Sequence, residues 1–183
     1  SGEVIYGVNT GFGKLSQIKI PPTKIDKLQK NLILSHAVGV GRPTPNLIVK
    51  IMLLLKIIAL SKGNSGIKIE TVDFLIKLFN YNCLPIVPQK GSVGASGDLA
   101  PLAHIALTLF GEGEVVYKTK KISSKSALKE LGLEPLKLKY KEGLALINGT
   151  QFSTAYGVYC INKIRNILKI ADIATALTVE SLE

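Results

Sequence analysis

The chain is poor in cysteine, and this shortage limits its chemistry. Cys83 and Cys160 are the only two cysteines among 183 residues, and they stand too far apart to match a metal-binding spacing. The pattern excludes a cysteine-rich metal site. It favours two free thiols in the core over a disulfide between them.

Arginine is almost missing, although the chain is strongly basic. The formal net charge is +10, yet Arg42 and Arg165 are the only arginines, and the lysines are scattered along the chain. Paired recognition of phosphates or bases favours arginine, and single-strand binders interleave stacking aromatics among their basic residues. The charge therefore predicts a solvated, lysine-rich surface and no nucleic-acid partner.

No apolar run is long enough to span a membrane. The longest covers residues 47–60 and is interrupted by Lys50 and Lys56, which would be costly within a bilayer. A starting methionine, a signal-peptide pattern and a lipidation motif are also missing. We therefore expect no membrane association and a cytoplasmic location. Because the final helical pattern has no stop signal, the chain is expected to be an excerpt of a longer protein.

The apolar pattern predicts a mainly α-helical fold. Hydrophobic residues make up 46% of the chain and the mean hydropathy is +0.29, which indicates a core and some apolar surface covered by missing chain or by other subunits. Helices are expected from Thr23 past His36, at about 46–62, 70–81, 98–110 and 125–131, and from about 150 onward. An extended segment at 84–88, a hairpin at 115–122 and a polar connection up to residue 149 complete the prediction.

Two acidic residues have the spacing of helix caps. Thr23 and Asp26 resemble a capping box, and Asp98 stands where a helix begins after a glycine-rich stretch. Such a stretch is often a phosphate cradle, but this one fits neither the dinucleotide nor the Walker spacing. Asp98 would also repel a phosphate and occupy the helix amides itself, so phosphate binding is disfavoured.

Three residues in this stretch could close a ring. If the Gly97 nitrogen met the Ala95 carbonyl carbon, a five-membered ring would form, and loss of water from it and from Ser96 would leave an exocyclic methylene. Closure through that nitrogen needs minimal bulk and wide backbone freedom, which glycine offers. The resulting methylidene-imidazolone is an electrophile, which ordinary side chains do not supply. By residue chemistry alone, a plain flexible turn remains the alternative.

Residues 91–104, GSVGASGDLAPLAH, closely resemble the signature of the aromatic amino acid ammonia-lyase family. Two further family-like segments accompany it in the expected order, YGVNTGFG at 6–13 and GLALINGT at 143–150. The resemblance implies the family's ammonia-lyase and fumarase-like helical fold. Residues 1–149 would form the N-terminal active-site region, with its small β hairpin, and 150–183 would begin a long helix of the central bundle. It also implies a homotetramer with shared active sites.

The resemblance assigns roles to the central signature. In the family, the segment matching Ala95, Ser96 and Gly97 cyclises autocatalytically into the methylidene-imidazolone prosthetic group. Asp98 matches the acidic residue that assists its formation. No metal and no diffusible cofactor would then be required.

Two residues from the flanking segments complete the carried-over chemistry. Tyr6 matches the family's loop tyrosine, the favoured base for the weakly acidic β-proton of the substrate. Gly7, Gly11 and Gly13 imply a mobile or tightly folded loop around it. Asn148 matches an asparagine beside the prosthetic group, where an amide can donate to its oxygen and orient the substrate amino group. From the residues alone, a packed turn tyrosine and a plain Asn-Gly turn are the alternatives.

Substrate choice depends on Ser35 and His36. By helical spacing His36 lies on the apolar face near a helix end, where a core histidine bonded to a backbone carbonyl would be usual. The family's selectivity pair sits at this place, and Ser-His resembles the histidine enzymes, whereas phenylalanine and tyrosine enzymes tend to show Phe-Leu or His-Leu. The imidazole could then bond to a substrate imidazole. His104, within the signature, is expected to be structural.

The implied reaction is non-oxidative elimination of ammonia from L-histidine to give trans-urocanate, as in histidine degradation. An arginine for the substrate carboxylate and other site residues are expected beyond residue 183, so the 183-residue chain alone would be inactive. A phenylalanine or tyrosine ammonia-lyase, an aminomutase and a catalytically inactive helical scaffold remain the alternatives.

Overall fold

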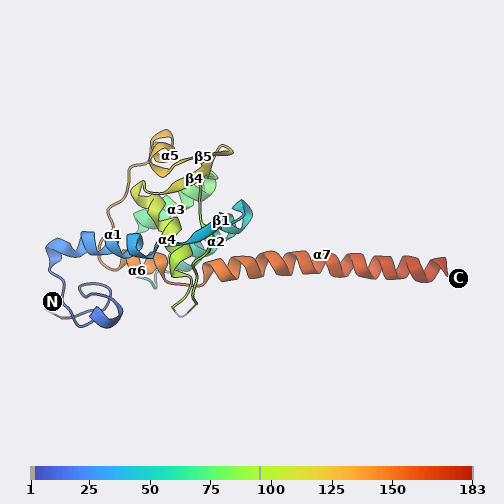
Figure 1. Ribbon diagram of the computed structural model, residues 1–183, viewed down its shortest axis with the longest axis horizontal. Coiled ribbons are helices and arrows are strands. Elements are labelled where there is room, and N and C mark those ends of the chain that lie inside the picture. The colour runs from blue at the N-terminus through green and yellow to red at the C-terminus, as the bar shows by residue number, and fades with distance from the viewer. Residues whose placement is uncertain (1–2, 95, 183) are drawn as a thin grey trace.

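The computed structural model describes residues 3–94 and 96–182. Seven helices dominate this part of the chain, which confirms the expected mainly α fold. They are α1 (Ile25–His36), α2 (Asn46–Ser61), α3 (Ile69–Asn80), α4 (Leu99–Leu107), α5 (Ser124–Glu130), α6 (Glu142–Ile147) and α7 (Gln151–Ser181). Short 3-10 turns lie at Gly13–Leu15, Pro22–Lys24 and Thr108–Phe110. The helices other than α7 gather into one body, and α7 extends away from it (Figure 1).

The core of the body includes buried side chains from α2, α3 and α4. Met52, Leu53, Leu75 and Ala103 are fully buried there, as the apolar periodicity of their helices requires. Helix α4 also packs against α1 and α6, and α2 packs against the start of α7. Helix α4 is therefore held on several sides, which fixes the position of the glycine-rich segment that precedes it.

Two small antiparallel sheets border the helices. Strands β4 (Glu114–Tyr117) and β5 (Lys120–Ser123) form the expected hairpin, and β2 (Leu84–Pro85) pairs with β4. Strand β1 (Val40–Pro43) pairs with β3 (Pro88–Lys90), which leads into the glycine-rich segment. The extended conformation of 84–88 was predicted from its prolines, but these strand pairings were not.

Helix α6 corrects the prediction of a polar connection before residue 149. Gly143 weakened any helical prediction there, since glycine disfavours helix interiors. In the structure a Cβ at Gly143 would lie 2.8 Å from Gln29 Oε1 and 3.0 Å from the Gln29 carbonyl oxygen. The glycine therefore permits α6 to approach α1 closely, and tertiary packing outweighs helix propensity.

One smaller prediction was wrong and another was correct only in part. The capping box is not formed, because residues 22–24 make a 3-10 turn and α1 begins at Ile25 without a side-chain cap. The thiols are both free, but only Cys83 is buried, whereas Cys160 is exposed on α7. Burial raises the pKa of the Cys83 thiol to about 11, since a thiolate would be poorly solvated there.

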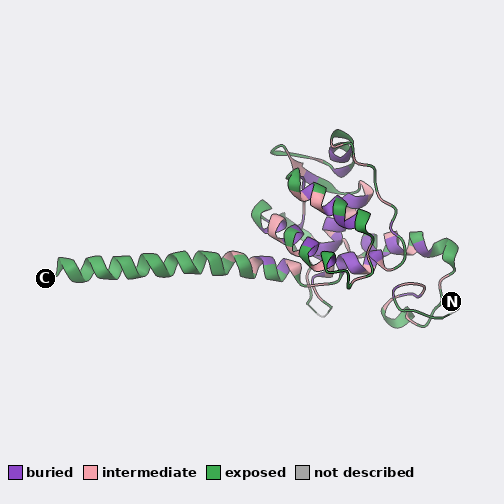
Figure 2. Ribbon diagram, turned by 180° about the vertical axis from the view of Figure 1, so that it is seen from behind, coloured by how far each residue is buried: buried purple, intermediate pink, exposed green. Residues whose placement is uncertain are grey.

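Helix α7 leaves the body after its first turns. Phe152 and Ala155 are buried, whereas every described residue from 160 onward is exposed (Figure 2). Its exposed residues include many large apolar side chains, among them Ile161, Ile167 and Ile173. Within the described ranges, no helix is long and apolar enough to cross a membrane.

Candidate active site

The Asp98 carboxylate joins two helices that are distant in sequence. It is 1% exposed and accepts hydrogen bonds from Ser92 Oγ at 2.6 Å and from Ser153 Oγ at 2.9 Å. Its other oxygen accepts the Ser153 backbone N–H at 2.8 Å. Because Ser153 lies in the first turn of α7, Asp98 satisfies an otherwise unpaired amide of that helix.

This geometry corrects the expected role of Asp98 as the cap of its own helix. Asp98 does occupy the N-cap position of α4, but its side chain accepts no hydrogen bond from the α4 amides. The carboxylate turns instead toward Ser92 and α7, where three donors converge. The residue thereby fixes both ends of the glycine-rich segment against the start of α7.

Gly97 is pressed against the chain segment that follows α6. Its φ is +93°, in the region that favours glycine, and it forms a parallel bridge with Gly149. A Cβ at Gly97 would collide with the Gly149 carbonyl oxygen. That same oxygen accepts the Asp98 backbone N–H at 2.7 Å. No residue other than glycine fits at position 97 without displacing this segment.

Ser96 is exposed and lies where two cavities meet. Ala95 lies outside the described residues. One cavity, of about 270 Å³, is lined by Tyr6, Phe12, Gly13, Leu32, His36, Ser96, Leu99, Leu144, Ile147 and Asn148. Four predicted site residues, Tyr6, His36, Ser96 and Asn148, therefore share one cavity. A second, of about 210 Å³, places Ser35 and His36 on one wall and Ser96 and Gly97 on another.

Tyr6 belongs to a tightly folded arm of residues 3–20. The arm is held by its own hydrogen bonds, including Ile5 N–H to Asn9 Oδ1 at 2.7 Å and Asn9 Nδ2 to the Glu3 carbonyl at 2.7 Å. A Cβ at Gly7 would lie 2.8 Å from Leu144 Cδ2, so the glycine lets the arm approach α6. Tyr6 is 51% exposed, and its ring meets Phe12 edge to face.

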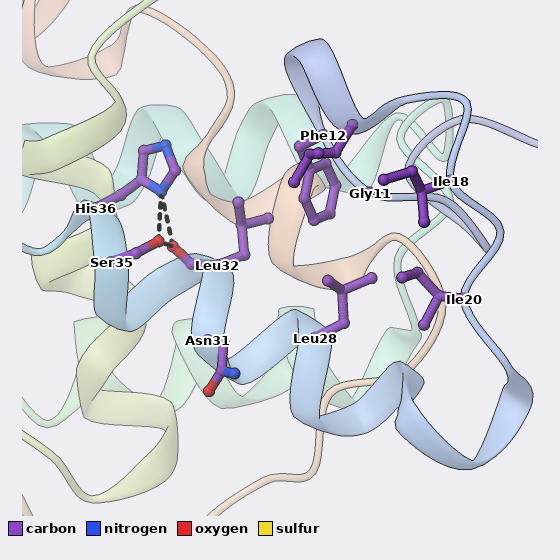
Figure 3. Close-up of a pocket in the computed structure, with 10 residues that line it drawn as sticks. Gly11, Phe12, Ile18, Ile20, Leu28, Asn31, Leu32, Ser35 and His36 are labelled. Atoms are coloured by element: carbon purple, nitrogen blue, oxygen red, sulfur yellow. Dashed lines mark hydrogen bonds between the residues drawn. The ribbon is translucent and has the colours of Figure 1, made fainter.

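His36 is the last residue of α1, and one of its ring nitrogens is already engaged. Nδ1 lies 2.8 Å from the Leu32 carbonyl oxygen and 3.2 Å from Ser35 Oγ, while Ser35 Oγ donates to the same carbonyl (Figure 3). A carbonyl only accepts, so Nδ1 carries the proton in this contact. In the neutral ring Nε2 is then an acceptor, and Figure 3 shows it on the far side of the ring.

A larger apolar cavity of about 350 Å³ lies between the arm and α1. Its wall also includes Ser35 and His36, together with Phe12, Ile20 and Leu28 (Figure 3). Neither Ser96 nor Tyr6 lines it. We take the cavity of about 270 Å³ as the candidate active site, because it brings together the polar residues that can act on a substrate.

Sequence reasoning missed three residues that support the site. Ser92 and Ser153 hold Asp98, and Lys56 Nζ donates to the Asn148 carbonyl oxygen at 2.7 Å. Lys56 is only 2% exposed, and burial lowers the pKa of its ammonium to about 8. A lysine whose neighbours along the helix pattern are apolar was the signal that could have drawn attention to it, although Lys50 on the same helix gives a similar signal.

His104 holds the turn that follows His36, in agreement with its predicted structural role. Its Nε2 accepts the Gly39 backbone N–H at 3.0 Å, which ties α4 to the turn that follows His36. Burial lowers the pKa of His104 below its ordinary value, since the charged imidazolium would be poorly solvated. A neutral ring is required for this contact, because only an unprotonated nitrogen accepts.

Comparison with known proteins identifies the family of the chain. A family model described as aromatic amino acid lyase matches residues 1–183. The chain belongs to the aromatic amino acid lyase family. It is 50% identical over 179 residues to a histidine ammonia-lyase of Alkaliphilus oremlandii, covering 98% of this chain and 35% of that protein. The chain thus spans about a third of the length of such curated relatives.

Solved structures of family members share the fold. A histidine ammonia-lyase from Trypanosoma cruzi superposes with a TM-score of 0.87 at 44% identity, over 94% of this chain and 33% of that one. A phenylalanine aminomutase from Pantoea agglomerans gives a TM-score of 0.88 at 38% identity, over 92% of this chain and 32% of that one. The predicted ammonia-lyase fold is therefore confirmed.

Proposed function

We propose that the protein containing this chain is a histidine ammonia-lyase, a carbon–nitrogen lyase that eliminates ammonia from L-histidine to give trans-urocanate. The observation that carries the proposal is the cavity shared by Tyr6, His36, Ser96 and Asn148. These residues come from four separate parts of the chain, and together they offer a base, an acceptor for an imidazole and an amide. The names of the relatives at about half identity support the same activity.

The residues present fit a prosthetic group formed from Ala95, Ser96 and Gly97. Position 97 accepts only glycine, its backbone is firmly supported, and Ser96 is exposed and lines two cavities. When formed, the methylidene-imidazolone would supply the electrophile that ordinary side chains lack. The buried Asp98 would keep the segment compressed during cyclisation, because its three donors join residue 92 to the start of α7.

The other residues would bind and orient the amino acid. Tyr6 would take the β-proton, since it is the candidate base that lines the cavity with Ser96. His36 Nε2 would accept the N–H of the substrate imidazole, because Nδ1 already donates to the Leu32 carbonyl. The Asn148 amide would orient the amino group, since Asn148 lines the same cavity.

The fold alone does not select the substrate, since a phenylalanine aminomutase is among the structural neighbours. His36 favours histidine, because its acceptor nitrogen would have no partner on a phenyl ring and would lose solvation without compensation. A phenylalanine or tyrosine enzyme of the same family is therefore the second candidate.

We also propose that α7 joins a bundle in a cytoplasmic homotetramer that completes each active site. The exposed apolar side chains of α7, such as Ile161, Leu168 and Leu177, would otherwise remain in water. The half-exposed Tyr6 supports the same arrangement, because a base for a weakly acidic proton needs more shelter than the arm alone provides.

The test is deamination of L-histidine, L-phenylalanine and L-tyrosine by the complete protein, followed by the ultraviolet absorbance of each unsaturated product. We expect urocanate formation to exceed the other two reactions by orders of magnitude in kcat/KM. A preference for phenylalanine or tyrosine would overturn the substrate assignment, and β-amino acid products would indicate an aminomutase.

A further inference from the structure

A lysine in the core of the body requires explanation. Lys56 lies in the middle of α2, whose neighbouring positions Leu53, Ile57 and Leu60 are buried apolar residues. The side chain is 2% exposed, so the ammonium does not reach water as surface lysines do. A buried charge is costly unless it is paired, and an apolar residue would suit this position better for stability alone.

No carboxylate compensates for this charge in the described parts of the chain, where Lys56 takes part in no ion pair. Its recorded partner is the Asn148 carbonyl oxygen, at 2.7 Å from Nζ. Asn148 follows the last residue of α6, and its backbone is already extended, with ψ of 131°. The lysine therefore binds the chain at the point where α6 ends and the segment beneath Gly97 begins.

The residues on either side of this carbonyl belong to the candidate site. Asn148 itself lines the cavity with Ser96 and Tyr6. The next residue, Gly149, contacts Gly97 and accepts the Asp98 N–H. One hydrogen bond from Lys56 thus acts on both, because the Asn148 carbonyl belongs to the peptide group that joins them.

We propose that Lys56 is a positioning residue that fixes the Asn148-Gly149 segment, and through it both the support for ring closure at Gly97 and the amide that faces the substrate. The proposal rests on the proposed function, since it concerns the same prosthetic group. Its role is indirect, because Lys56 lines none of the cavities that contain Ser96.

The test compares Lys56→Met, Lys56→Arg and the control Lys50→Met in the complete protein. Lys50 lies on the same helix and donates to Asn82 Oδ1, away from the site. Intact mass after a fixed incubation measures maturation, that is, the fraction of chains that have lost two waters. Circular dichroism and thermal unfolding report whether each variant folds. The kcat of each variant is divided by its fraction of matured chains.

Lys56→Met is expected to fold, yet to mature about tenfold more slowly and to lose about tenfold in kcat with KM within about twofold, as for one lost charge-assisted hydrogen bond. Lys56→Arg keeps the charge and the donors and should recover most of the maturation. Lys50→Met should match the wild type in both readouts.

Wild-type maturation and kcat in Lys56→Met would overturn the proposal. If that variant does not fold, Lys56→Gln replaces it, since its shorter neutral amide should slow maturation; wild-type behaviour of Lys56→Gln would be equally contradictory. Failure of the proposed function is distinguishable, because the wild type itself would then show no loss of two waters or no urocanate.

Discussion

The two walls of the candidate site are held in very different ways. On one wall, Ser96 is followed by Gly97 and Asp98, which are fixed by contacts and hydrogen bonds that reach α7 and the segment after α6. On the other, Tyr6 is half exposed in an arm of residues 3–20, which is stabilised chiefly by bonds among its own residues. The first wall is built into the body, whereas the second lies against its surface.

This difference suggests a division of labour. Ring closure needs a compressed backbone, and compression requires the rigid support that buried hydrogen bonds give. Proton removal needs a base that approaches the substrate after it has entered, which a separately folded arm permits. Formation of the prosthetic group and turnover should therefore respond to different substitutions.

The largest expected effect comes from Ser96→Ala. Without the hydroxyl no second water can leave and no methylene can form, so both the two-water mass deficit and turnover should disappear. Intact mass and a urocanate assay of the complete protein measure the two outcomes. Retained turnover would contradict the proposed chemistry.

Tyr6→Phe should impair turnover without affecting formation of the prosthetic group. The arm keeps its ring contact with Phe12 but loses the base, so kcat should fall by about 100-fold to 10,000-fold. The mass deficit should persist, because the hydrogen bonds to the Asp98 carboxylate come from Ser92 and Ser153 and not from Tyr6. Loss of the mass deficit in this variant would show that the arm is needed for ring closure. It would contradict the inference that ring formation and proton removal depend on different walls.

His36→Leu is expected to reduce selectivity more than chemistry. Removal of the acceptor Nε2 should lower kcat/KM for L-histidine by about tenfold, the effect of one hydrogen bond to substrate. Activity toward L-phenylalanine should rise in the same variant, since no polar nitrogen is left unpaired against its ring. An unchanged ratio of the two kcat/KM values would remove His36 from substrate recognition.

Ser153→Ala tests the rigid wall with a smaller change. It removes the hydroxyl donor to Asp98 while the backbone N–H bond remains, so the free energy of unfolding should fall by about 2 kcal/mol, as for a bond to a charged group. Maturation should slow as well. Ser181→Ala, at the exposed end of α7, is the control and should change neither the denaturation midpoint nor the two-water mass deficit.

The smallest effect concerns pH and His104. Burial holds the folded pKa below the ordinary value of 6.5, so stability from this group is present above pH 6.5 and is lost as the pH falls through the folded pKa. Denaturant titrations from pH 7 downward should show this loss in the wild type and a shallower one in His104→Gln. Equal slopes would mean that the Gly39 contact does not depend on a neutral ring.

Most of the fold follows from local pattern. The apolar spacing in α2 and α3 and the glycine after residue 110 predict their elements to within a few residues. Helix α6 was missed because Gly143 is selected by its close approach to Gln29, which no local pattern reveals.

The candidate site was likewise predictable only where it depends on local sequence. The motif around Ser96 indicates ring chemistry, but its supports come from far away in sequence. Ser153 is 55 residues from Asp98, and Lys56 is 92 residues from Asn148. The direction of the Asp98 side chain likewise depends on where α7 begins, so local capping rules assigned it to the wrong helix.

The proposed cyclisation of residues 95–97 on the rigid wall changes the mass of the peptide that contains them. Mass spectrometry of the peptide that contains Ser96, released by proteolysis from the complete wild-type protein, measures this directly. We expect a peptide lighter than its sequence by two water molecules, with the deficit located at residues 95–97. A peptide of full, unmodified mass would contradict it.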